Sequence, residues 1–139
     1  MTEALKLTLT LPSRLSLLAF ISRVVLDALA QVVEPGIHHA LAPKLDVCLS
    51  EAVTNAITHA HKGDPLLAVT VALSVAAGDV TLSVTDHGPG FDFDGLKVPE
   101  LEELREHGRG IHIIRQTMRR VTYKQGESGN VLEMSIPTS

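Results

Sequence analysis

The stretch of residues 45–61 constrains the fold most, because its apolar side chains recur with the period of an α-helix. A core-facing stripe is made by Leu45, Leu49, Ala52, Val53, Ala56, Ile57 and Ala60. Beside the stripe, Glu51, Asn55 and His59 are spaced four residues apart and form one polar ridge. Such a ridge either lines the rim of a cavity or is a solvated flank, and its spacing alone favours the solvated flank.

The N-terminal third predicts a strand and then a helix. Apolar and polar residues alternate over residues 4–11, as in a strand with one buried face. Ser13 is a suitable N-cap for a helix that runs to about Val33. We expect Pro35 to stop that helix and the central helix to start after Pro43.

The second half predicts more strands and one more helix. The strands are expected at residues 67–75, 80–85, 119–124 and 131–136, and the helix at residues 111–118. The connection of residues 86–109 is rich in Gly, Pro and acidic residues, has room for a short helix at residues 99–106, and is typical of a lid. This order predicts an α+β fold with one domain over residues 1–139. We expect a two-layer sandwich in which a mixed, mainly antiparallel sheet packs against helices on one face.

The composition argues against several classes of protein. Only 3% of the residues are aromatic and none is Trp, so aliphatic side chains must fill the core. A formal net charge of −4 argues against direct nucleic-acid binding. The single cysteine, Cys48, excludes an internal disulfide and is expected to be a small buried residue. Residues 15–33 are apolar but interrupted by Ser22, Arg23 and Asp27, and no signal peptide is evident, so we expect no membrane contact and a cytoplasmic location.

Two glycine-rich segments carry further candidate chemistry. Asp86-His87-Gly88-Pro89-Gly90 follows a strand, where the Asp86 carboxylate can face a ligand or bond its own backbone in a tight turn. Gly108-Arg109-Gly110 opens a helix, whose free N–H groups and positive dipole end suit a phosphate. The same segment would also serve as a simple flexible junction.

The three segments together resemble the nucleotide-binding boxes of the GHKL ATPase superfamily, which groups gyrase, heat-shock chaperone, histidine kinase and MutL ATP-binding domains. Glu51-Ala52-Val53-Thr54-Asn55-Ala56-Ile57-Thr58-His59 is similar to the N box, Asp86-His87-Gly88-Pro89-Gly90 to the G1 box, and Gly108-Arg109-Gly110-Ile111 to the G2 box. The small size and the Ser50-Glu51-Ala52-Val53-Thr54-Asn55-Ala56 segment resemble the anti-sigma-factor serine kinases of the RsbW/SpoIIAB type. The resemblance covers nearly the whole chain and implies a Bergerat-type ATP-binding fold.

The resemblance implies roles for the residues that match its boxes. Asn55 would coordinate a Mg²⁺ ion that bridges the phosphates of ATP, and Glu51 would be the general base for the attacking hydroxyl. Asp86 would accept a hydrogen bond from the adenine amino group. Gly88 and Gly90 would let the chain pass close to the nucleotide.

The phosphate end of the site is implied in the same way. Gly108 and Gly110 would offer backbone N–H groups to the phosphates, and His59 would contact phosphate or pack within the fold. Kinases of this branch often place a lid cation beside the γ-phosphate, where this chain has Glu106. The cations left for that role are Arg105, His107 and Arg109. The chain also departs from many relatives at Gly129-Asn130, where they have Gly-Thr near the adenine.

The resemblance further implies a protein-serine kinase that is also an anti-sigma factor. Such a protein holds a sigma factor inactive and phosphorylates a serine on a small STAS-domain anti-anti-sigma antagonist. Residues 15–33 would supply part of a homodimer or sigma-binding surface, with Arg23 as a candidate contact. The alternative is a nucleotide-binding module that sequesters its partner without significant kinase activity.

Overall fold

The computed structural model describes residues 3–88 and 106–139. Along the chain, the elements are β1 (Leu5–Pro12), η1 (Leu15–Leu17), α1 (Leu18–Val32), α2 (Pro35–Thr54), η2 (Asn55–Ala60), β2 (Ala68–Ala76), β3 (Asp79–Asp86), α4 (Glu106–Thr117), β4 (Arg120–Gly126) and β5 (Gly129–Pro137). All five expected strands are present, with bounds that differ from the predicted ones by one or two residues.

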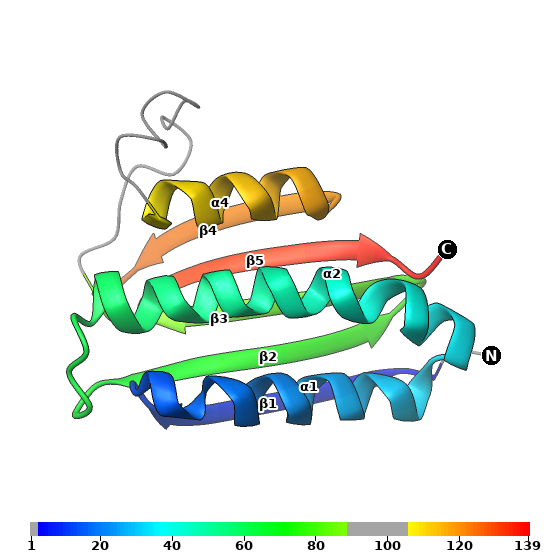
Figure 1. The fold of residues 1–139 in the computed structure, drawn as a ribbon, viewed down its shortest axis with the longest axis horizontal. Coiled ribbons are helices and arrows are strands. Elements are labelled where there is room, and N and C mark those ends of the chain that lie inside the picture. Colours follow the sequence, from blue (N-terminus) through cyan, green and yellow to red (C-terminus); the bar gives the residue numbers. More distant parts are fainter. Residues whose placement is uncertain (1–2, 89–105) are drawn as a thin grey trace.

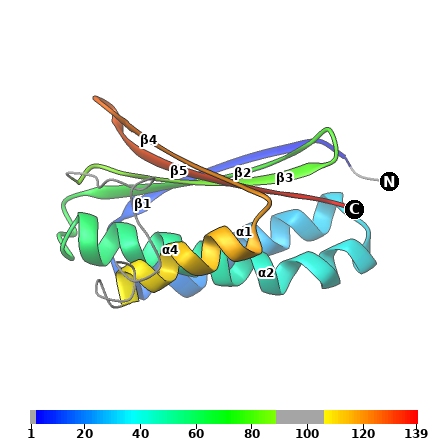
Figure 2. The same cartoon turned by 90° about the horizontal axis from the view of Figure 1, so that it is seen from above.

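The five strands form a single sheet in the order β1-β2-β3-β5-β4. All four neighbouring pairs are antiparallel, so the parallel pairing expected of a mixed sheet is not found among the described residues. Helices α1, α2 and α4 lie beside one another and cover one face of this sheet (Figures 1 and 2). The predicted α+β fold with helices on one face is confirmed.

The core lies between the helices and the covered face of the sheet. Alternate residues of each inner strand are buried, such as Val80, Leu82 and Val84 of β3. The α2 and η2 stripe packs onto them, because six of its seven apolar residues are buried and only Ala60 is partly exposed. The described core contains no aromatic residue, as the composition led us to expect.

The central helix begins earlier than predicted. Helix α1 ends at Val32, just before Pro35, as predicted, but Pro35 also opens α2, where its missing N–H costs nothing and its fixed φ suits the first turn. Pro43 lies inside α2 instead of preceding it. Buried Leu41 and Leu45 flank Pro43, so packing against the core holds the helix together across a residue that normally ends one.

The ends of the other helices also differ from the predictions. Ser13 does not cap a helix: the residue before η1 is Arg14, and no side chain caps η1 or α1. Helix α4 starts at Glu106 and not after Gly110. Most of the predicted lid, including the short helix expected at residues 99–106, lies outside the described residues apart from Glu106.

Residues Leu15–Val32 have the length and the mean hydropathy, 1.7, of a membrane-spanning helix, a test that core helices also pass. In this fold α1 places Ile21, Val25 and Leu29 in the core, while Arg23 and Asp27 are exposed. The helix is amphipathic, as the interrupted apolar pattern predicted.

Candidate nucleotide-binding site

The site is built on a change of helix type within the predicted central helix. Helix α2 ends at Thr54 and the next six residues, Asn55–Ala60, form the π-helix η2. The N–H of His61 accordingly bonds to the carbonyl of Ala56, five residues back, at 2.9 Å. Short π-helical turns inside α-helices are frequent at functional sites.

The polar ridge lines a pocket and is not merely a solvated flank. Glu51, Asn55 and His59 all border a pocket of about 470 Å³. The other residues that line it are Leu15, Ser50, Thr54, Thr58 and Ile113. Asn55 is only 8% exposed, whereas His59 is exposed at the rim. The spacing of the ridge therefore survives the change to a wider helical turn.

Gly110 of α4 packs directly against this ridge. A Cβ atom added to Gly110 would lie 2.7 Å from Glu51 Oε2 and 3.2 Å from Asn55 Nδ2. Only a residue without a side chain lets α4 approach the carboxylate and the amide together. The glycine-rich segment of residues 108–110 thus meets the ridge, as the sequence motifs predicted.

The amide of Asn55 is buried without being satisfied by the described part of the chain. Its Nδ2 has no hydrogen-bond partner among the described residues. Buried side-chain amides are almost always paired, so an orphaned one beside a glycine cradle points to a polar ligand. The arrangement fits a nucleotide phosphate group with its metal ion.

The other glycine-rich segment follows β3 and contacts the opposite end of η2. A Cβ atom on Gly88 would lie 2.6 Å from the backbone oxygen of Ala60. We name residues 86–88 the β3 turn. The β3 turn and Gly110 therefore touch the same six-residue helix, one near its last residue and one near its first.

Asp86 is the last member of the core-facing row of β3, which places its carboxylate beneath the helices. Its Oδ1 accepts hydrogen bonds from Gly88 N–H at 2.9 Å and from Asn130 Nδ2 at 2.9 Å. Asn130 Nδ2 also donates to the Gly88 carbonyl at 2.7 Å. Asp86 thus makes the tight-turn bond to its own backbone, and Asn130 supports both the carboxylate and the turn.

Gly129 completes this corner of the site. Its φ of +128° is one that side-chain-bearing residues rarely adopt, and an added Cβ would lie 2.8 Å from the Asp86 backbone oxygen. The Gly129-Asn130 pair, where the family resemblance led us to expect Gly-Thr, therefore fits closely against Asp86.

His61, which the sequence analysis did not single out, follows η2 and is only 3% exposed. Its Nε2 accepts from the backbone N–H of His87 at 2.8 Å, and its Nδ1 lies 2.9 Å from Ser13 Oγ. Since a backbone N–H can only donate, Nε2 carries no proton and Nδ1–H donates to Ser13. Burial lowers the pKa of His61 below the ordinary 6.5, opposed by Asp86 and Asp64 and reinforced by His87. The ring is therefore a neutral link.

The remaining predicted site residues are placed only in part. Gly90 and Arg105 lie outside the described residues. His107, Gly108 and Arg109 belong to the first turn of α4, and nothing is described of their side chains. Because α4 already includes Glu106, Gly110 lies at least four residues inside the helix, where a backbone N–H normally bonds within the helix.

The described part of the site offers few side-chain groups that could bind a metal ion. No group of three or more His, Cys, Asp or Glu in the described ranges could hold a metal ion. Magnesium in nucleotide sites keeps several waters and is bound by few protein oxygens together with the phosphates. The amide oxygen of Asn55 beside Glu51 fits that pattern.

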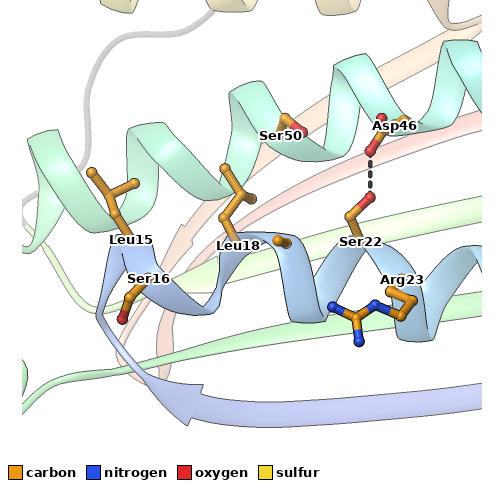
Figure 3. Close-up of a pocket in the computed structure, with 8 residues that line it drawn as sticks. Leu15, Ser16, Leu18, Ser22, Arg23, Asp46 and Ser50 are labelled. Atoms are coloured by element: carbon orange, nitrogen blue, oxygen red, sulfur yellow. Dashed lines mark hydrogen bonds between the residues drawn. The ribbon is translucent and has the colours of Figure 1, made fainter.

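A second pocket, of about 580 Å³, lies between α1 and α2 (Figure 3). Arg23 lines it from α1, where Ser22 Oγ also donates to Asp46 of α2. Leu15, which is exposed, lines both this pocket and the pocket beside Glu51, Asn55 and His59. The predicted surface of residues 15–33 therefore adjoins the candidate site.

Residues 11–136 match the family described as the histidine kinase-like ATPase domain. The chain belongs to this family. Among similar proteins, the serine-protein kinase RsbW of Bacillus subtilis (strain 168) is 32% identical to this chain, over 66% of the length of this chain and 61% of the length of RsbW. RsbW of Oceanobacillus iheyensis is 27% identical over 70% of this chain and 66% of its own. The anti-sigma F factor of Anoxybacillus flavithermus is 29% identical over 78% of this chain and 82% of its own.

These relatives confirm the resemblance to RsbW/SpoIIAB-type proteins that the three motifs indicated. The histidine kinase-like ATPase domain described here spans slightly under two thirds of the length of the two RsbW proteins.

Solved structures share the fold of this ATPase domain. The SiaB-SiaC complex from Pseudomonas aeruginosa aligns with a TM-score of 0.69 at 21% identity, over 94% of this chain and 88% of that one. The blue-light activated histidine kinase of Erythrobacter litoralis EL346 aligns with a TM-score of 0.56 at 24% identity, over 72% of this chain and 31% of that one. At these identities the likeness concerns the fold alone.

Proposed function

We propose that this chain is an ATP-dependent protein-serine kinase that also acts as an anti-sigma factor. The observation that carries the proposal is the position of Gly110, whose missing side chain leaves α4 against both Glu51 and Asn55. Glu51, the proposed general base, and Asn55, with its unsatisfied amide, line one pocket, and Ile113 of α4 also borders it.

The base of the nucleotide would bind at the β3 turn. The Asp86 carboxylate would accept from the adenine amino group, and Asn130 would hold that carboxylate in place. Guanine carries an oxygen where adenine carries its amino group, so a fixed acceptor at this point would favour ATP over GTP. Gly88 would let the chain pass close to the nucleotide, and Gly90 would do the same.

The phosphates would lie between η2 and the start of α4. Asn55 would offer its amide oxygen to Mg²⁺, which when bound neutralises charge on the phosphates. Backbone N–H groups near Gly108 would face the phosphate oxygens, with Gly110 giving room for them. His59 at the rim would contact phosphate, and Arg105, His107 or Arg109 would supply the lid cation.

Transfer would proceed with little covalent chemistry from the protein. Glu51 would take the proton of a partner's serine hydroxyl as its oxygen attacks the γ-phosphorus. The bond from that phosphorus to the bridging oxygen breaks, and ADP leaves. The chain itself would position the groups, which is the main requirement of phosphoryl transfer.

The proposed partners follow from the RsbW-type relatives. The chain would hold a sigma factor inactive in the cytoplasm and phosphorylate a STAS-domain anti-anti-sigma protein. A homodimer or the sigma factor would use the α1 surface, where Arg23 lines the pocket between α1 and α2 (Figure 3). No direct contact with nucleic acid or membrane is proposed.

The test is incubation with Mg-ATP and the STAS-domain protein that co-purifies with the chain, followed by mass spectrometry of phosphoserine. We expect Glu51→Ala to abolish transfer while nucleotide binding, measured by calorimetry, stays largely intact. Full transfer by this variant would refute the role of Glu51. Nucleotide binding by the wild type with no phosphoserine formed would favour the sequestering module, which Glu106 at the usual position of a lid cation also suggests.

A further inference from the structure

We propose that His61, which lies outside the three motifs, is a positioning residue that holds the β3 turn in its nucleotide-binding conformation, and does so only while its imidazole is neutral. The inference rests on the proposed function, because the β3 turn is the proposed contact for adenine. It adds a residue and a pH dependence that neither the motifs nor the relatives' names indicate.

His61 joins three segments that are distant in sequence. Its ring receives the N–H of His87, the middle residue of the β3 turn, and donates to Ser13 just after β1. Ser13 is itself fully buried, and its N–H bonds to the carbonyl of Leu67 at 2.9 Å. The turn is therefore tied through His61 to the end of β1, a fixed part of the sheet.

The close packing beside this link makes it sensitive to small shifts. Gly88 lies so near Ala60 that even a Cβ would reach 2.6 Å from the Ala60 oxygen. The rings of His61 and His87 are nearly parallel, with centroids 6.2 Å apart. Movement of the His87 backbone would therefore carry Asp86 and Gly88 with it, away from η2 and Asn130.

Protonation would break the link at a defined atom. A proton added to Nε2 would face the His87 N–H, so that two donors meet and the hydrogen bond is lost. The ionisable groups around the ring are Asp86 from β3, His87 from the turn, and Asp64 from the segment before β2. The two carboxylates would stabilise the imidazolium charge but cannot restore the bond to His87.

The experiment measures binding of Mg-ADP by calorimetry between pH 5.5 and 8.0. His61→Gln keeps an uncharged acceptor at about the reach of Nε2, and His61→Phe keeps a ring without one. His39→Gln is the matched control, because His39 is exposed on α2 and remote from the turn. Comparing variants in the same buffers cancels the titration of ADP itself.

We expect the affinity of the wild type, relative to His61→Gln, to fall by up to about tenfold per pH unit below the pKa of His61, the limit for one proton. His39→Gln should follow the wild type, and His61→Phe should bind weakly at every pH. In ¹⁵N-resolved NMR of the wild type, the His87 amide should lose its protection from exchange over the same pH range.

The outcomes separate the two proposals. Equal pH profiles for wild type and His61→Gln, with strong binding by both, would overturn the role of His61 and leave the proposed function standing. Failure of the wild type to bind Mg-ADP at any pH would overturn the proposed function and this inference with it. A His87 amide that stays protected at a pH where the ring signals of His61 in the same spectra show that it has taken up its proton would also overturn the inference, whatever the affinities.

Discussion

Asn130 lies directly opposite Asp86 in the β3–β5 ladder, and its Nδ2 donates to the Asp86 carboxylate at 2.9 Å. Both residues end rows that are otherwise apolar and face the helices. The pair therefore forms the polar end of the core. The family resemblance leads one to expect Thr where this chain has Asn130, and the amide supplies two donor hydrogens where a hydroxyl would supply one.

Replacing Asn130 should weaken both the fold and base selectivity. Asn130→Ala removes the side-chain donor to the part-buried oxygens of Asp86 and Gly88 and leaves Asp86 Oδ1 with the Gly88 N–H alone, which should cost about 1–3 kcal/mol of unfolding free energy. The ratio of ATP to GTP affinity should also narrow. Denaturant unfolding and calorimetry measure the two effects. Asn130→Thr is the control and should retain part of the stability and part of the selectivity. An unchanged ratio of ATP to GTP affinity in Asn130→Ala would contradict the role of this pair.

Gly110→Ala should separate activity from stability. The new methyl would displace the Glu51 carboxylate, whose flexible end can move, while alanine favours the helix by about 1 kcal/mol over glycine. We expect a melting temperature equal to or above that of the wild type, with phosphoryl transfer reduced by about a hundredfold. A large loss of stability would show that the contact is structural.

Gly88→Ala should behave in the opposite way. Its methyl would meet the Ala60 backbone at 2.6 Å, and backbone atoms cannot move aside cheaply. We expect a loss of about 1–3 kcal/mol in unfolding free energy. The matched control is Gly36→Ala, because nothing lies within 4 Å of a Cβ there and Gly36 is helical. Equal stabilities of the two variants would contradict the packing of the β3 turn against η2.

The unfolding free energy should fall as the solution is acidified. His61 has a lowered pKa in the folded chain, so below about pH 6.5 the unfolded chain takes up a proton that the folded one does not. This contribution is fully present above pH 6.5 and is lost as the pH falls toward the folded pKa. Denaturant titrations from pH 5.0 to 8.0 should show a shallower decline for His61→Gln than for the wild type.

Cys48 should be unreactive in the folded protein. Its side chain is fully buried, and burial raises the pKa of its thiol, with Glu51 adding to the rise and Thr117 opposing it. A maleimide or disulfide reagent should label it only upon unfolding. Rapid labelling under native conditions, with Cys48→Ala as the blank, would show that α2 opens locally.

Much of the fold could be predicted because it depends on local patterns. Alternation predicted the first strand, strand-forming runs between turn residues predicted the other four, all to within two residues at each end, and the apolar stripe predicted the central helix. The central helix starts earlier than predicted because proline weakens a helix locally, but packing of Leu41 and Leu45, on either side of Pro43, against the core outweighs that local preference. A local sequence pattern does not contain the free energy of packing against distant residues.

The candidate site was predicted where motifs exist and missed where a role depends on distant contacts. Ser13 was interpreted as a helix cap, yet its hydroxyl bonds a histidine 48 positions away. A usable signal for His61 was nevertheless present. The row Leu45, Leu49, Val53, Ile57 and His61 repeats every four residues, so its polar last member continues a buried row. Asp86 and Asn130 end apolar rows of their strands in the same way.

The wide turn that begins at Asn55 has a consequence for how this site can vary. Each residue of an α-helix advances by about 100° around the axis, and a π-helical turn advances less per residue. If residues 55–60 took an ordinary α-helical path, the imidazole of His61 would rotate away from Ser13 and from the His87 N–H. No polar side chain would have to be replaced for this to happen. Substitutions of the aliphatic residues packed under residues 55–60 can therefore weaken ligand binding, because they change the helical path of the backbone and with it the position of His61.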